Sequence, residues 1–182
     1  MNFKFQIFNF KKETIISALI LMVLGFVLLQ LPINILAGSR VKFTAFDLFA
    51  PIAASFAGLG IGAVSVLAVQ IANIVFHGTA VDRGVIIRLL PTLFALWYFS
   101  RKSKYQLLFP ILAIISFNLN PVGRSVWYYS LFWLIPLFTY PFKNRFLVLR
   151  SLGSTFTAHA VGGAIWIWAF NLPASVWQGL IP

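Results

Sequence analysis

The sequence predicts an all-α protein, a polytopic transmembrane helical bundle of six to seven membrane helices that forms a single domain over residues 1–182. The chain is 60% hydrophobic and only 9% charged, and its mean hydropathy is +0.93. A soluble domain of this length does not need so much apolar surface, so the excess fits an exterior that is solvated by lipid. A β-barrel would instead show short segments of alternating polarity.

Apolar segments of helical length follow one another along the chain. The basic, aromatic stretch 1–12 is expected to lie at the membrane interface. Segments 46–59 and 60–76 are short for a full crossing, so one of them is expected to tilt or to re-enter. Pro136 is expected to kink the sixth helix. We expect loops at 33–44 and 77–84, the start of an incomplete last helix at 173–182, and helices near 14–30, 46–59, 60–76, 85–99, 105–117, 125–142 and 146–171.

The basic residues set the expected orientation. The net charge is +11, with 14 Lys and Arg. In a soluble chain this would suggest a nucleic-acid partner, but these residues lie in short loops, where they set topology and attract anionic lipid headgroups. Seven crossings with a cytoplasmic N-terminus place nine of them inside and five outside. We therefore expect a multi-pass protein of the plasma membrane, with lipids and no nucleic acid as partners.

The sequence offers little for catalysis or for a metal. It has no cysteine, two histidines and three carboxylates. A zinc or nickel site would need three or four ligands, so His77, His159, Asp47 and Asp82 would all have to converge. No nucleophile has an evident partner base, and there is no phosphate-binding loop. We expect no enzyme activity, no cofactor and no bound metal; catalysis at His159 is the weakest alternative.

The last long helix carries an unusual polar stripe. Ser151, Thr155, His159, the pair Gly162-Gly163 and Trp166 fall on one face at helical spacing. A histidine is costly in lipid, so this face should meet protein or a polar cavity. Two interpretations stay open: His159 ties helices together while the glycines allow close packing, or His159 serves a functional site.

Polar and aromatic residues gather at the outer helix ends. This pattern predicts a small-molecule pocket that opens to the outside. The alternative is an interfacial aromatic belt with snorkelling arginines, but a belt does not explain the deeper polar residues. The candidate substrate-binding residues are Gln70, Asn73, His77, Asp82, Arg83, Arg88, Asn118, Arg124, Trp127, Tyr128, Thr155, His159 and Trp166.

Three stretches carry a family resemblance: FDLFAPIAASFAGLGIGAVSVLAVQIAN (46–73), DRGVIIRLLPTLFALWYF (82–99), and STFTAHAVGG with LPASVWQGLIP (154–163 and 172–182). In texture and helix order they resemble the substrate-binding S components of energy-coupling factor transporters, which take up vitamins and other micronutrients. The resemblance implies a pocket closed by the loop 33–44. It also implies docking on a transmembrane coupling subunit driven by two ATPase subunits.

The chain departs from this family in two places. The first helix lacks an Ala-x-x-x-Ala docking motif, and small residues at that spacing occur instead at Ala50, Ala54, Gly58 and Gly62. Asn2 stands where the metal-capturing branch has a histidine, which argues against a cobalt or nickel cargo.

The expected function is a substrate-capture subunit of a micronutrient importer that binds a small anionic or aromatic solute. Five outer cations against two acids favour an anion held by Arg83, Arg88 or Arg124. Trp127, Tyr128 and Trp166 offer faces on which a flat ring could stack. The alternative is a non-transport membrane scaffold, such as an envelope-assembly subunit, with a protein partner on the inner basic loops.

Overall fold

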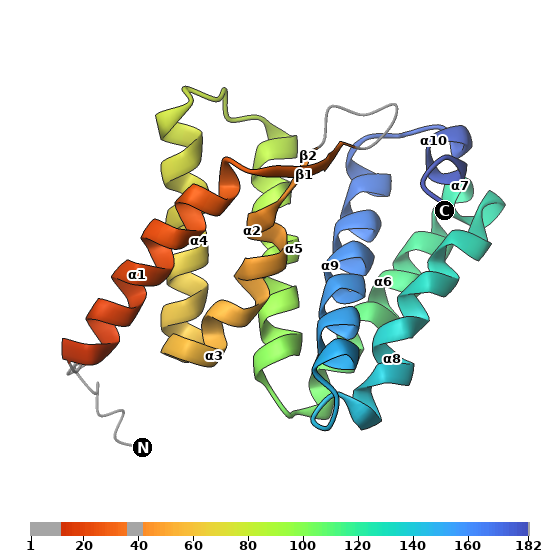
Figure 1. Ribbon diagram of the computed structural model, residues 1–182. Helices are drawn as coiled ribbons and strands as arrows, with labels where there is room; N and C mark the ends of the chain where they lie inside the picture. Colours follow the sequence, from red (N-terminus) through yellow and green to blue (C-terminus); the bar gives the residue numbers. More distant parts are fainter. Residues whose placement is uncertain (1–11, 36–41, 182) are drawn as a thin grey trace, which may run out of the picture.

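The computed structural model describes residues 12–35 and 42–181 (Figure 1). It is almost entirely helical, so the prediction of an all-α fold is confirmed. By length and composition, two of the described helices, α1 and α4, are long and apolar enough to cross a membrane. A bundle of six to seven spans remains a prediction. The long helices are α1 (Lys12–Leu29), α4 (Leu59–Phe76), α5 (Arg83–Ser100), α6 (Leu108–Leu119) and α9 (Leu147–Ala169).

The predicted helix 46–59 is shorter than expected and is not a single α-helix. It consists of α2 (Ala45–Phe49), η1 (Ala50–Ile52) and α3 (Ala53–Ala57). It ends at Gly58, whose φ of 80° is a left-handed conformation that favours glycine. A Cβ on Gly62 would lie 2.6 Å from the Cα of Ala54, so α3 and α4 cross in backbone contact. The small-residue spacing in this region thus serves packing within the chain.

The predicted loop 33–44 was wrong for its described parts. Pro32–Ile35 (β1) and Lys42–Thr44 (β2) pair as antiparallel strands, while residues 36–41 lie outside the described residues, as does 1–11 of the expected lead-in. The amide of Ala45 donates to the carbonyl of Leu31 at 2.9 Å, next to the strand pair. Pairing between the ends of a segment depends on where its flanking helices stand, which local sequence does not report.

The predicted helix 125–142 was also wrong in its geometry. Residues Trp127–Leu134 wind as a 3₁₀ helix, η3, and Pro136 lies in the first turn of the α-helix that follows. Proline is tolerated there because its missing N–H would have no intrahelical partner. The remaining short helices are η2 (Lys104–Leu107), α7 (Pro121–Ser125), α8 (Ile135–Thr139), η4 (Tyr140–Phe142) and α10 (Ala174–Gln178), the last within the predicted terminal helix.

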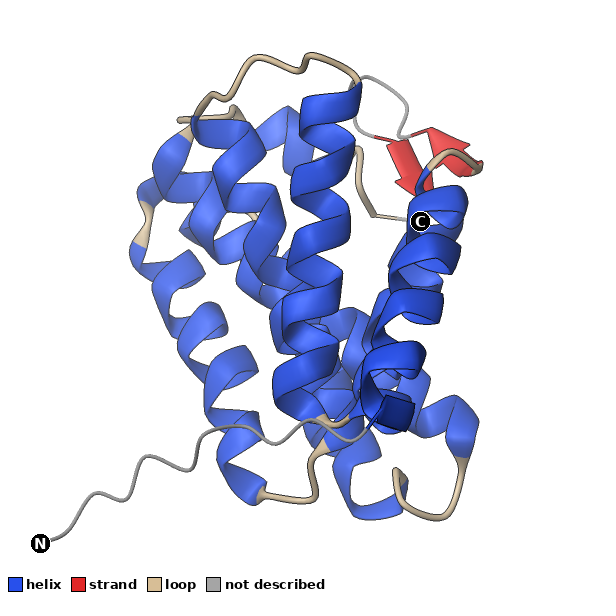
Figure 2. Cartoon of the chain, turned by 90° about the vertical axis from the view of Figure 1, so that its left-hand side faces the viewer, coloured by secondary structure: helices blue, strands red, loops and turns tan. Residues whose placement is uncertain are grey.

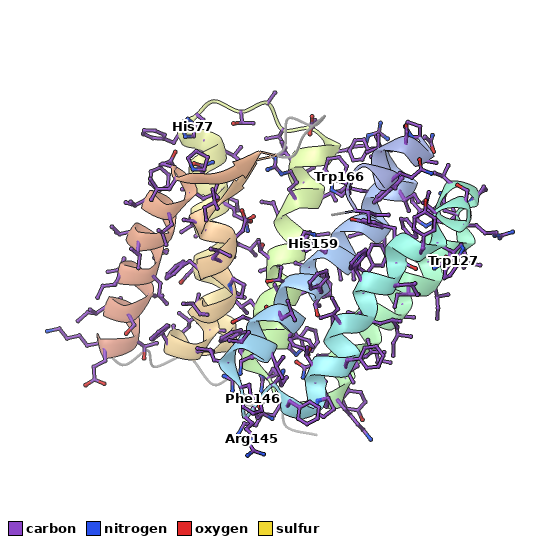
Figure 3. All side chains as sticks on the ribbon, turned by 45° about the vertical axis from the view of Figure 1, so that its right-hand side comes forward. His77, Trp127, Arg145, Phe146, His159 and Trp166 are labelled. Carbon is purple, nitrogen blue, oxygen red and sulfur yellow. The ribbon has the colours of Figure 1, made fainter. Side chains whose placement is uncertain are left out.

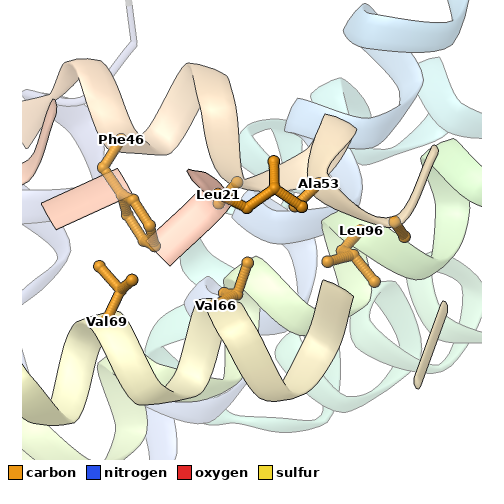
Figure 4. Packing of buried hydrophobic residues seen from close by; sticks show 8 residues of the cluster. Leu21, Phe46, Ala53, Val66, Val69 and Leu96 are labelled. Atoms are coloured by element: carbon orange, nitrogen blue, oxygen red, sulfur yellow. The ribbon is translucent and has the colours of Figure 1, made fainter. Parts of the chain in front are cut away.

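Two hydrophobic clusters hold the bundle together. Figure 4 shows the first, where Leu21, Phe46, Val66 and Leu96 bring α1, α2, α4 and α5 together. The second includes Phe117, Trp133 and Trp177 and joins α6, η3, α9 and α10. Between the clusters α5 packs along α9. The strands lie at the same end of the bundle as the loop between α4 and α5 (Figure 2).

The opposite end of the bundle contains a buried lysine. Lys143 is only 1% exposed. Its ammonium group donates to the carbonyl of Tyr98 and to Oε1 of Gln106 at 3.0 Å, and it lies 4.2 Å from the centre of the Tyr98 ring. Burial, with a smaller contribution from the charge of Arg150, lowers the pKa of Lys143 to about 8. Lys143 therefore ties the end of α5 to η2 and η4.

Candidate functional site

A cavity of about 490 Å³ lies between the two halves of the bundle. Residues of β1, β2, α2 and η1 line one side, and residues of α9 line the other. The face of α5 from Arg88 to Ala95 forms the floor. Residues 172–180, in and around α10, and Tyr129 of η3 complete the wall. The site therefore draws on segments from nearly the whole described chain.

Four titratable side chains line this cavity: Asp47, Arg88, Tyr129 and His159. One oxygen of Asp47, Oδ2, accepts from the amide of Thr44 at 2.8 Å and from its hydroxyl at 3.2 Å. These bonds fix the carboxylate at the start of α2, where the helix dipole also favours it. His159 interacts electrostatically with Asp47 and packs 5.8 Å from the ring of Phe156.

Arg88 lies one turn into α5 and is exposed. Within residues 12–35 and 42–181, its guanidinium makes no hydrogen bond or ion pair. A guanidinium on the wall of a cavity presents donors in a planar fork that matches a carboxylate or phosphate. Arg88 is therefore the cavity residue best suited to an anionic group.

Trp177 forms part of the cavity wall through its ring. Its side chain is 3% exposed and lines the cavity, and its ring packs 5.1 Å from Phe117 and 5.4 Å from Tyr129. The indole N–H is buried and has no hydrogen-bond partner among the residues that the structure describes, so this nitrogen is also closed to a solute in the cavity. A buried N–H without a partner is costly.

The structure brings four of the thirteen predicted residues to the cavity: Arg88, Thr155, His159 and Trp166. Figure 3 shows His159 and Trp166 along α9. Gln70 lies behind the wall, since its Nε2 donates to the hydroxyl of Thr92, a cavity residue, at 3.2 Å. The remaining eight predicted residues lie elsewhere.

One group of these lies around the outer ends of α1, α4 and α5. Asn73 and His77 both contact Gln30, which follows α1. Oδ1 of Asn73 accepts a hydrogen bond from Nε2 of Gln30 at 2.8 Å, and Oε1 of Gln30 lies 2.9 Å from Nε2 of His77. Asp82 caps α5 by accepting from the amide of Val85 at 2.8 Å, and Arg83 beside it is exposed. These residues tie or cap helix ends and do not line the cavity.

The other group lies around α6, α7 and η3. Asn118 donates to the hydroxyl of Ser130 at 2.9 Å, and Arg124 donates to the carbonyl of Asn118 at 3.5 Å. Trp127 and Tyr128 are 55% and 37% exposed and contact each other edge to face. In Figure 3, Trp127 lies on the opposite side of the molecule from His77. These two aromatics therefore lie on the surface and do not line the cavity.

Three cavity residues were missed as site residues: Asp47, Tyr129 and Trp177. Asp47 was predicted only as one of four possible metal ligands, and the strand pair that places it at the cavity was not expected. Trp177 follows Pro173 in a segment with no periodicity, so the only available signal was a large aromatic residue in a polar turn.

Both interpretations of the α9 stripe describe part of it. A Cβ on Gly163 would lie 2.5 Å from the ring of Trp133, and one on Gly162 would lie 3.3 Å from Pro91. The glycines therefore allow the close packing of α9 against its neighbours. Thr155, His159 and Trp166 line the cavity on the same helix.

Within the described ranges, no group of three or more His, Asp or Glu side chains could hold a metal ion. Comparisons with protein-family models, with curated proteins and with solved structures found no match to this chain. The resemblance to S components therefore stays a prediction that rests on the residues.

Proposed function

We propose that this chain is a membrane-embedded substrate-capture protein that binds a small anionic solute in the cavity between α2, α5 and α9. The observation that carries the proposal is the cavity itself. Its volume of about 490 Å³ is in the range of small-molecule sites. Its walls are mainly apolar, and Arg88, His159 and Asp47 supply a few convergent polar groups.

The surface of the bundle supports placing it in a membrane. Large apolar side chains are exposed on several helices, among them Val23 (68%), Phe56 (69%), Val75 (75%) and Phe138 (71%). Soluble monomers rarely expose apolar surface on this scale, whereas lipid solvates it at no cost. The basic loops 101–104 and 143–150 lie at the end opposite the strands, as a cytoplasmic side requires. The cavity then lies toward the outer face, and the N-terminus is cytoplasmic.

The class of solute follows from the polar groups. Arg88 has no counterion among the described residues and would bind a carboxylate or phosphate in bidentate fashion. Trp166 and Tyr129 supply aromatic faces and edges for an apolar part of the solute. A vitamin-like micronutrient with an acidic group has both features.

The resemblance extends the proposal to partners. As an S-component-like subunit, the protein would dock on a transmembrane coupling subunit with two ATPase subunits, which would supply the energy for uptake. This step rests on the resemblance alone, and co-purification of those three subunits from the host membrane tests it.

Native mass spectrometry of the protein, purified gently from its host membrane, tests solute capture. We expect a bound small molecule of a few hundred daltons that is lost in His159→Ala and in Arg88→Ala. Arg83→Ala is the matched control, because it removes an exposed arginine from the same helix but not from the cavity, and it should retain the bound molecule. Circular dichroism and size-exclusion chromatography check that each variant is folded.

A spectrum that carries only phospholipid or a partner chain, in the wild type and all variants alike, would contradict solute capture. That result would favour the scaffold alternative, in which the inner basic loops bind a protein partner.

A further inference from the structure

The proposed cavity is elongated along the membrane normal. On α9 its lining runs from Thr155 to Trp166, and eleven residues of α-helix span about 16 Å. On α5 it runs from Arg88 to Ala95. A single flat ring would fill only one end of a cavity with this length.

Contacts between α5 and α9 fix which ends of the two helices meet. A Cβ on Gly84 would lie 3.8 Å from Trp166, so the start of α5 lies beside the end of α9. At the other end of the cavity, the hydroxyl of Ser154 donates to the carbonyl of Ala95 at 2.7 Å. Arg88 therefore lies toward the Trp166 end, which is the outer end, while Ala95 and Thr155 mark the deep end.

The polar and apolar parts of the wall separate along this axis. Arg88 lies at the outer end, and Asp47 and His159 also line the cavity. The deep end on α5 is formed by Thr92 and Ala95, and the hydroxyl of Thr92 already donates to the carbonyl of Leu89 at 3.1 Å. The cavity is thus charged where a head group would lie and weakly polar where a tail would lie.

The cavity also has an exposed edge on the side of the bundle. Leu48 of α2 and Ile33 of β1 line it and are 68% and 57% exposed. Figure 1 shows α2 in front of α5, with α9 beside them. In the proposed membrane position this side faces the outer lipid leaflet.

From these observations we infer that the solute is a single-chain amphiphile with an anionic head group, and that it enters sideways between α2 and α9 from the outer leaflet. Its head group binds Arg88, and its apolar chain extends toward Ala95 and Thr155. The inference rests on the proposed function and narrows its solute class.

Two carboxylates of different chain length test this inference in phosphatidylcholine nanodiscs. Tritiated dodecanoate and hexanoate share one head group, and binding to empty nanodiscs is subtracted. We expect saturable binding of dodecanoate at least about tenfold tighter than that of hexanoate, because each buried methylene adds affinity. Arg88→Gln should weaken both by about tenfold.

A substitution at the deep end tests the binding of the apolar chain separately from the binding of the head group. Thr155→Trp fills the deep end from an exposed position, and it should weaken dodecanoate at least about tenfold while leaving hexanoate within about twofold. Val64→Trp, at a 67% exposed position on α4 outside the cavity, should change neither. Equal affinity of the two carboxylates, or unchanged dodecanoate binding in Thr155→Trp, would overturn the inference.

The entry route is tested by labelling. The chain has no cysteine, so Leu48→Cys and Val64→Cys each give one labelling site for a bulky maleimide. The label at residue 48 should slow dodecanoate association at least about fivefold, and the label at residue 64 should not, because only the former lies at the exposed edge. Equal rates would overturn sideways entry.

The two carboxylates also separate this inference from the proposed function. Arg88-dependent binding of hexanoate with no gain for dodecanoate would overturn the amphiphile and leave solute capture standing. Binding of neither carboxylate would overturn this inference, and the native mass spectrum would then decide the proposed function.

Discussion

Helices α1 and α9 were both expected to cross the membrane, and they differ sharply in how the protein uses them. Only Leu21 and Gly25 of α1 are buried, and apolar side chains such as Ile20 (60%) are exposed. In α9 the buried residues are mostly small or polar, including Gly153, Ser154 and Thr157. The mainly exposed apolar helix α1 therefore lies at the edge of the bundle, and the helix with small and polar residues lies at its centre.

The largest expected effect of this difference comes from adding volume. Gly163→Leu places a side chain against Trp133, which is 1% exposed and has no room to move. We expect a loss of about 3 kcal/mol or more, or failure to fold, in a thermal or denaturant melt in detergent. Leu19→Trp on α1, at a 53% exposed position, should change the midpoint very little. Similar effects in both helices would show that the two are packed alike.

The next effect concerns pH and the buried Lys143 at the inner end of α9. Its pKa is lowered to about 8 from 10.5, and Tyr98, Gln106, Tyr140 and Arg150 surround it. Between these two values the unfolded chain binds the proton and the folded chain does not, so stability rises with pH from 8 toward 10.5. A gain of about 1 kcal/mol between pH 7 and pH 9 is expected in melts.

The matched variants are Lys143→Met, which should lose this pH dependence, and Lys102→Met, which removes an exposed lysine from the same end and should keep it. A wild-type profile that stays flat over this interval would mean that the folded protein retains the proton on Lys143.

The smallest expected effect compares two serines whose hydroxyl groups each donate a hydrogen bond to a backbone carbonyl. Ser154 in α9 donates to Ala95 at 2.7 Å and is fully buried, whereas Ser17 in α1 donates to Glu13 within its own helix at 2.8 Å and is near the surface. Ser154→Ala should cost about 1 kcal/mol because the carbonyl of Ala95 loses a buried partner. Ser17→Ala should cost less than about 0.5 kcal/mol. Equal losses in chemical denaturation would contradict the central position of α9.

Periodic features could be predicted from the sequence, and non-local ones could not. The helices near α4, α5 and α9 were predicted closely because apolar runs of helical length are local patterns. The polar stripe of α9 pointed to Thr155, His159 and Trp166, since one helix face is set by spacing alone. Asp47 and Trp177 were missed because a strand pair and a terminal segment bring them to the cavity. His77 and Trp127 were grouped with the site because both were expected at the same end of the bundle. They lie on opposite sides of the molecule and do not line the cavity, since the order of helices around a bundle is not a local sequence pattern.

The cavity has a consequence for biosynthesis, since its wall includes both Ile33 and Leu180. Trp177 packs against Phe117 and Tyr129 only after every long helix has been made. The cavity is therefore incomplete until the α10 segment has been synthesised. If the proposed function holds, ribosome-bound chains that lack this segment should insert into the membrane normally and fail to retain solute.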